Sequence, residues 1–206
     1  MRSVDREILR LAVPALGALI AEPLFLLADT AMVGHLGPSA LGGLAIASTV
    51  LQTVLGLMIF LAYATTPRVA KRMGSGDLRG AVSAGFDGMW LSVAISALLL
   101  VGGLPLLGPV VRAFGPAAEV EAAAYTYLTI SWWGVPFMLL VIAGTGLLRG
   151  LQDTKTPLKV AGGGFGGNIV LNAVLIYGLD LGIAGSAIGS VLAQAGMAAV
   201  VLGIAF

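Results

Sequence analysis

Hydrophobic residues occur along this chain in six long blocks, separated by short polar or glycine-rich breaks. Most blocks hold about 20 or more apolar residues, the length that a helix needs to cross the hydrocarbon core of a bilayer. The breaks are rich in turn-forming residues, for example at 34–38 (Gly-His-Leu-Gly-Pro) and at 74–77 (Gly-Ser-Gly-Asp). The pattern therefore predicts six transmembrane helices, at about 7–34, 39–66, 81–111, 120–148, 157–178 and 183–206.

The distribution of basic residues supports six spans. With this number, ten of the eleven Lys and Arg residues fall on one side of the membrane, and only Arg112 falls on the other. Basic residues concentrate in cytoplasmic loops, so this side and the N-terminus are expected to be cytoplasmic. We therefore expect a multi-pass protein of the cell (plasma or inner) membrane. The ten residues are Arg2, Arg6, Arg10, Arg68, Lys71, Arg72, Arg79, Arg149, Lys155 and Lys159.

Composition narrows the classes of function. Hydrophobic residues make up 58% of the chain and charged residues 10%, whereas soluble domains have about 25% charged residues. The chain has no cysteine and one histidine, His35, so we expect no metal site, no cofactor and no thiol chemistry. No basic patch is interleaved with aromatic residues, so we expect no nucleic-acid partner. We find no set of residues that would form a catalytic site. Residues 162–167 have the glycine spacing of a dinucleotide-binding motif, but the strand that must precede such a motif is missing from the predicted elements.

Two acidic residues lie inside the first predicted helix. Glu22 and Asp29 are seven residues apart, nearly two full turns, so they share one face. A charged carboxylate near the bilayer centre costs about 2.5–3.5 kcal/mol, so both should face the bundle interior or water. Pro23 removes a backbone hydrogen bond between them and allows the helix to bend. We therefore interpret Asp29 and Glu22 as candidate cation-coupling residues that exchange a proton at ordinary pH.

Polar residues on the other predicted helices could form a cavity around this acid. Asn168 and Asn172 are four residues apart and share a face of the fifth helix. The sixth helix carries a stripe of three polar residues. Such groups either hold helices together by hydrogen bonds or line a substrate cavity, and both interpretations stay open. The candidate cavity residues are Gln52, Tyr127, Asn168, Asn172 and Ser190, and the stripe is Ser186, Ser190 and Gln194.

A short internal repeat links the second and sixth predicted helices. Residues 43–52 (GLAIASTVLQ) and 185–194 (GSAIGSVLAQ) agree at five of ten positions, including a serine and a glutamine four residues apart. Both segments follow a short outer turn, as expected for a parallel repeat about an axis along the membrane normal. In sequence rich in glycine and alanine such a match also arises by chance, so both explanations stay open.

Three segments resemble the multidrug and toxic compound extrusion (MATE) transporters. They are residues 27–37 (LADTAMVGHLG), residues 148–157 (LRGLQDTKTP), and the stretch from Asn168 to Ser190. The first is most similar to the DNA-damage-inducible, DinF-like subgroup. The resemblance implies an all-α membrane fold of twelve helices in two six-helix lobes. Residues 1–206 would then be the N-terminal lobe, and the C-terminal lobe would be absent from this chain.

The resemblance also implies a function. MATE transporters are antiporters that export organic, often cationic, drugs or toxins in exchange for inward protons or sodium. Asp29 matches the acid of their first helix, which is implicated in cation coupling, and Asn168 matches a nearby asparagine. Tyr127 and Ser190 match polar cavity positions. Some members carry a second acid where this chain has Asn172, so we favour protons over sodium.

Other functions stay open at this stage. Related two-lobed transporters flip lipid-linked precursors, although no basic residue of this chain is expected inside the membrane. A non-transporting membrane scaffold, or a half-size transporter acting as a homodimer, also fits the length. The expected partners are therefore small organic cations, the lipid bilayer, and either a missing second lobe or a second copy.

Overall fold

The computed structural model describes residues 13, 16, 20, 23–24 and 26–205, and every regular element among them is a helix. The predicted all-α fold class is therefore confirmed. Residues 26–34 form the end of the first helix, and Glu22 lies outside the described residues. The elements that follow are α2 (Pro38–Met58), α3 (Phe60–Gly74), α4 (Leu78–Gly103), the 3₁₀ turn η1 (Leu104–Leu106), α5 (Leu107–Ala113), α6 (Ala118–Trp132), α7 (Val135–Gly150), α8 (Lys155–Asn172), the π-helical turn η2 (Ala173–Gly178) and α9 (Gly182–Ala205).

These elements combine into helical stretches long and apolar enough to cross a membrane. Four such stretches occur in the described part of the chain, at Pro38–Gly74, Leu78–Ala113, Lys155–Gly178 and Gly182–Ala205. The pair α6–α7 makes a fifth if the bent pair counts as one span. These five occupy the positions of the second to sixth predicted helices.

The second helix differs in length from the prediction. It was expected to end at residue 66, before Pro67, whereas the structure continues through Pro67 to Gly74. Proline removes one backbone hydrogen bond and usually ends or kinks a helix. Here Pro67 is exposed, and α3 packs along both α4 and α7. We attribute the continuation to these tertiary contacts.

The fourth helix was expected to be continuous over 120–148, and this is wrong. It breaks at Trp133 and Gly134, and α6 and α7 are inclined to one another by 52°. Pro136 lies in the first turn of α7, where its missing N–H is tolerated. Any side chain at Gly134 would overlap Oε1 of Gln194 on α9, so glycine fits this bend.

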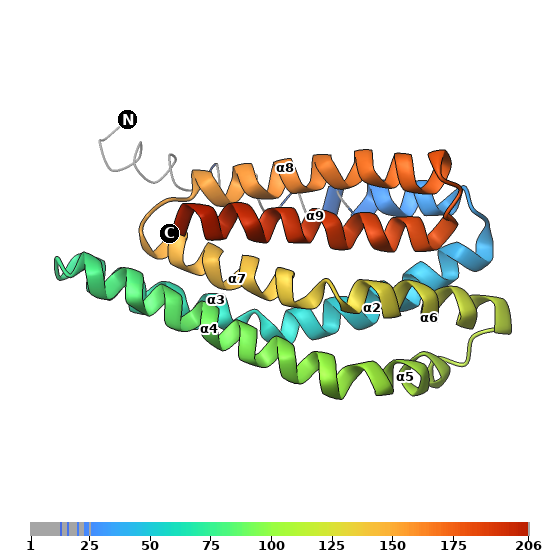
Figure 1. The fold of residues 1–206 in the computed structure, drawn as a ribbon, viewed down its shortest axis with the longest axis horizontal. Helices are drawn as coiled ribbons and strands as arrows, with labels where there is room; N and C mark the ends of the chain where they lie inside the picture. The colour runs from blue at the N-terminus through green and yellow to red at the C-terminus, as the bar shows by residue number, and fades with distance from the viewer. Residues whose placement is uncertain (1–12, 14–15, 17–19, 21–22, 25, 206) are drawn as a thin grey trace.

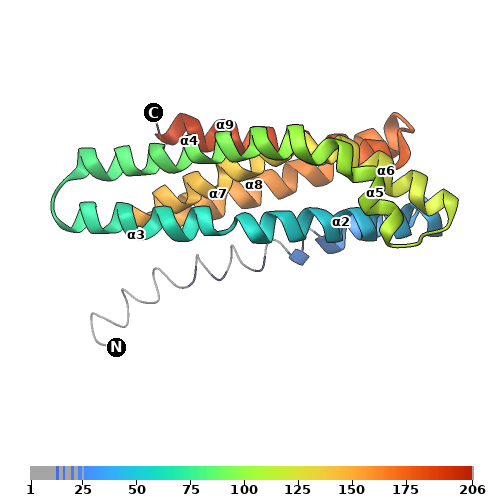
Figure 2. The ribbon, with the colours of Figure 1, turned by 90° about the horizontal axis from the view of Figure 1, so that it is seen from below.

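The bent pair α6–α7 lies in the middle of the bundle (Figures 1 and 2). α6 packs against α2 and α9, and α7 packs against α3, α4 and α9. The hairpin of α8 and α9 runs along one side of this pair (Figure 1). The end of the first helix joins the same core through Val33, and the hydroxyl of Tyr177 donates to the carbonyl of Met32 at 2.8 Å. These contacts place Asp29 against α6, α8 and α9.

Candidate functional site

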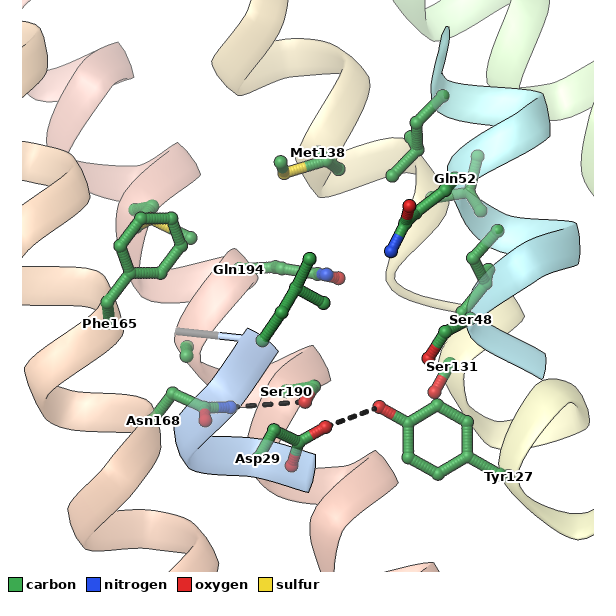
Figure 3. A pocket seen from close by; sticks show the side chains of 16 residues that line it. Asp29, Ser48, Gln52, Tyr127, Ser131, Met138, Phe165, Asn168, Ser190 and Gln194 are labelled. Carbon is green, nitrogen blue, oxygen red and sulfur yellow. Dashed lines mark hydrogen bonds between the residues drawn. The ribbon is translucent and has the colours of Figure 1, made fainter. Parts of the chain in front are cut away.

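Asp29 lies at the centre of a buried polar cluster. Its side chain is 4% exposed. Asn172 Nδ2 on α8 and Ser186 Oγ on α9 donate to Asp29 Oδ1, at 2.8 and 2.7 Å. The hydroxyl of Tyr127 on α6 donates to the other oxygen, Oδ2, at 3.4 Å (Figure 3). One carboxylate therefore joins the first helix to three others.

The asparagines extend this cluster along α8 toward α9. Asn172 Nδ2 also donates to Asn168 Oδ1 at 3.1 Å, and Asn168 Nδ2 donates to Ser190 Oγ at 3.1 Å (Figure 3). The four-residue spacing of the asparagines allows this bond along one helix face. Gly189 leaves the space for Asn172, because a Cβ at Gly189 would overlap Asn172 Oδ1. The absence of a side chain at Gly189 therefore leaves room for the amide that contacts Asp29.

Within the described part of the chain, the carboxylate of Asp29 has only neutral hydrogen-bonding partners. The two ion pairs in the described part of the chain, Arg72–Asp77 and Arg112–Glu121, both involve exposed side chains elsewhere. A buried carboxylate is normally paired with a positive charge or protonated, since an isolated buried ion is costly. Asp29 therefore lies where a proton or an external cation would neutralise it.

A cavity of about 110 Å³ adjoins the cluster. Its polar lining includes Asp29, Tyr127 and Asn168, and its apolar lining includes Met138 and Phe165 (Figure 3). Met197 also contributes to the apolar lining. The cavity thus combines a carboxylate with polarisable and aromatic surface. Its lining residues are Leu26, Asp29, Ser48, Leu51, Gln52, Leu55, Tyr127, Ser131, Val135, Met138, Phe165, Asn168, Ser190, Ala193, Gln194 and Met197.

The structure brings most of the predicted site residues together. Asp29, Gln52, Tyr127, Asn168 and Ser190 all line the cavity. Asn172, in contrast, is fully buried beside Asp29 and is not among the lining residues. Asp29 was expected beside Asn168, but Asn172 is its direct partner and Asn168 is one hydrogen bond further away. Glu22, the second predicted coupling acid, lies outside the described residues.

Sequence reasoning missed two polar lining residues, Ser48 and Ser131, as well as the apolar ones. Ser48 precedes Gln52 by four residues, and Ser131 follows Tyr127 by four, so each shares a helix face with a residue that was predicted. This spacing was the signal that could have identified both.

A second aspartate in hydrogen-bonded surroundings lies outside the membrane-spanning segments. Asp153 Oδ1 accepts from the backbone N–H groups of Lys155 and Thr156, both at 3.0 Å, and the Thr156 hydroxyl donates to Oδ2. Burial alone would raise the pKa of Asp153, but these hydrogen bonds and the nearby charge of Lys159 outweigh it and hold the pKa below its usual value. Asp153 thus caps the start of α8.

Membrane-length helices around a buried acid and an adjoining cavity define a polytopic helical membrane protein with the features of a secondary transporter. The comparison with known families agrees. The family model described as MatE matches residues 14–174. The chain therefore belongs to the MatE family, whose members are transporters.

Individual relatives show the same relationship. The "Probable multidrug resistance protein NorM" of Thermotoga maritima is 27% identical over 93% of this chain and 42% of its own length. The DNA damage-inducible protein F of Escherichia coli K12 is 29% identical over 94% of the chain and 42% of its length. A crystal structure of a MATE in the bent conformation superposes with a TM-score of 0.88, at 27% identity over 94% of this chain and 43% of that one. The chain thus spans about two fifths of the length of these relatives.

Proposed function

We propose that this chain forms one lobe of an antiporter that exports small organic cations in exchange for protons entering the cell. The observation that carries the proposal is the buried carboxylate of Asp29, whose partners among the described residues are all neutral. A proton and a cationic substrate would both neutralise this charge, so they would compete for it. Such competition is the thermodynamic basis of exchange. The name of the Thermotoga relative, a multidrug resistance protein, agrees with drug export.

The partners of Asp29 favour a proton over sodium as the coupling ion. Hard metal cations bind several oxygen ligands. Around Asp29, however, the groups within hydrogen-bonding distance are donors: the amide of Asn172 and the hydroxyls of Ser186 and Tyr127. Asn172 presents its N–H₂ group to the carboxylate of Asp29, whereas an acid at position 172 would present oxygen atoms. The two hydroxyls can turn to accept the O–H of a protonated Asp29, whereas a sodium site needs further oxygen ligands, so this single carboxylate suits a proton better.

The cavity walls suit an aromatic cation. Asp29 supplies negative charge on one side, and Phe165 supplies a ring face that attracts cations. Met138 and Met197 add flexible, polarisable surface that adapts to different ligands. Among the described residues, the cavity lining includes no Lys or Arg. This lining disfavours the alternative of an anionic, lipid-linked precursor as substrate.

The proposed exchange requires two conformations with different affinity for the proton, because a proton that binds both equally drives nothing. We propose that protonation of Asp29 bends the first helix near Pro23 and shrinks the cavity. Pro23 is helical and exposed, as a bending position should be. A second wall, from a second lobe or a second copy of the chain, would complete the transport path of the substrate. The N-terminus would lie in the cytoplasm.

The experiment that tests this function is efflux of ethidium, an aromatic cation, from proteoliposomes under an imposed pH gradient or an imposed sodium gradient. The wild type should respond to the pH gradient, and Asp29→Asn should abolish that response. Asp87→Asn is the matched control, since Asp87 is an exposed acid within α4. Normal pH-driven efflux by Asp29→Asn would contradict the proposal, and its loss only in Glu22→Gln would assign the coupling role to Glu22.

A further inference from the structure

A second hollow lies between α5 and α6 and shares no lining residue with the cavity at Asp29. Its volume is about 380 Å³, within the size range of pockets that bind small ligands. α5 and the start of α6 lie together at one end of the bundle (Figures 1 and 2). The lining residues are Gly108, Val111, Arg112, Ala118, Glu121, Ala122 and Tyr125.

This hollow lies where the helices reach the surface of the membrane. Residues 88–111 carry no charged side chain, so Arg112 is the first charge at this end of the span Leu78–Ala113. Glu121 lies three residues after the start of α6 at Ala118. The rise of 1.5 Å per residue places both charges within about 5 Å of a helix end. The headgroups of lipids occupy this layer, next to the hydrocarbon core.

The two charged side chains of the hollow have unused hydrogen-bonding groups. Arg112 Nε donates to Glu121 Oε1 at 3.1 Å, and the two side chains are 70% and 37% exposed. This bond uses one of the five N–H groups of the guanidinium. The other four, and Oε2 of Glu121, have no hydrogen-bond partner in the part of the chain that the structure describes. The hollow therefore offers donors and an acceptor of opposite charge side by side.

We propose that this hollow binds the zwitterionic headgroup of phosphatidylethanolamine. The free N–H groups of Arg112 donate to the phosphate, as guanidinium groups do in two-point contacts with phosphates. The carboxylate of Glu121 accepts from the ammonium group, and the ring of Tyr125 adds a face that attracts cations. Basic pockets between membrane helices are known sites for lipid headgroups. A neutral pair of opposite charges thus meets a neutral ligand with the same two charges.

The surface beside the hollow suits the acyl chains of a lipid. Val101 and Leu106 belong to the same span as Arg112 and are 81% and 57% exposed. In a membrane these side chains face hydrocarbon, so a lipid whose headgroup lies at Arg112 covers apolar surface with its chains. This inference does not depend on the proposed transport function, because Asp29 does not line this hollow.

Three lipids with the same dioleoyl chains provide a matched test. Phosphatidylcholine has both charges but no N–H on its nitrogen, and phosphatidylglycerol has the phosphate but no ammonium group. Binding to the purified full chain in detergent is titrated by native mass spectrometry. The wild type should bind phosphatidylethanolamine about tenfold more tightly than either other lipid, as expected for hydrogen bonds to a charged group. Equal binding of the three lipids would overturn the proposal.

Two substitutions break the same ion pair with different predicted effects. Arg112→Gln should weaken the binding of phosphatidylethanolamine and phosphatidylcholine alike, by about tenfold, because both carry the phosphate. Glu121→Leu should remove the preference between these two lipids. Both variants should fold, since an exposed ion pair contributes little to stability. Glu119→Leu is the matched control, because Glu119 lies in the same turn of α6, accepts from Ser39 and does not line the hollow.

A Glu121→Leu variant that keeps the wild-type lipid preference would overturn the proposal. Glycerophosphoethanolamine, which has the headgroup without acyl chains, tests whether the ligand is a lipid. Because the chains contribute most of the membrane affinity, at least about a hundredfold more of this compound should be needed to displace the lipid. Displacement at equal concentration would contradict the assignment to a lipid. Asp29→Asn should bind phosphatidylethanolamine as the wild type does, which keeps this test separate from the test of transport.

Discussion

The two aspartates, Asp29 and Asp153, receive similar hydrogen bonds in opposite electrostatic settings. Each accepts at least one bond from a hydroxyl and at least one from an amide N–H, at about 3 Å or less. Asp153 lies in the loop before α8, near Lys159 and at a helix N-terminus, where negative charge is favoured. Asp29 lies inside the bundle, and its hydrogen-bonding partners in the part of the chain that the structure describes are all neutral.

This difference separates a structural acid from a candidate coupling acid. The hydrogen bonds of Asp153 are local, within three residues, and they fix the start of one helix. Those of Asp29 connect residues about 100 to 160 positions apart on different helices. A change in the protonation of Asp29 therefore alters contacts among four helices, whereas the same change at Asp153 alters one helix end.

The largest effect in this comparison is expected from Asn172→Leu, which removes an N–H donor from Asp29 and keeps the size of the side chain. Hydrogen bonds to charged groups contribute about 1.5–3 kcal/mol. Transport of ethidium driven by a pH gradient should therefore fall by at least about tenfold. The neighbouring substitution Ile169→Leu, at a position 40% exposed on α8, should have little effect. Equal rates in the two variants would show that Asp29 functions without this amide.

A smaller effect is expected from Gly189→Ala, whose added Cβ would overlap Asn172 Oδ1 and displace the amide. Overpacking of this kind typically costs about 1–3 kcal/mol. The thermal unfolding temperature and the transport rate should both decrease. Gly196→Ala on the same helix has free space around its Cβ and should be neutral or stabilising. If both variants unfold at the same temperature, Gly189 does not position Asn172.

The smallest effect is expected from Asp153→Asn. The pKa of Asp153 is lower in the folded protein than its usual value of 3.8, so the ionised group stabilises the fold above that pH. The contribution disappears as the pH falls through the lowered pKa. At pH 7 the variant should lose about 1 kcal/mol, as for other helix caps, with unchanged transport. As the pH falls below 3.8 and through the lowered pKa, the thermal stability of the variant should approach that of the wild type. A loss of transport at neutral pH would remove the distinction between the two acids.

The sequence was sufficient to locate the helices but not their contacts. The long hydrophobic blocks of the sequence predicted the five spans that the structure describes, because the thickness of the bilayer sets the length of a span. The bend at Trp133 and Gly134 was missed, since a proline such as Pro136 either kinks a helix or starts a new one, and the sequence alone does not show which. Spacing placed Asn168 and Asn172 on one face, but which of them reaches Asp29 depends on Gly189 across the interface.

The most direct test of the central claim, that Asp29 exchanges a proton for a cationic substrate, is proton release on substrate binding. Ethidium is added to the purified protein in weakly buffered detergent solution, and the pH change is recorded with an indicator dye. The account predicts release of up to about one proton per bound ethidium from the wild type and from Asp153→Asn, and none from Asp29→Asn. Release from Asp29→Asn equal to that of the wild type would contradict it.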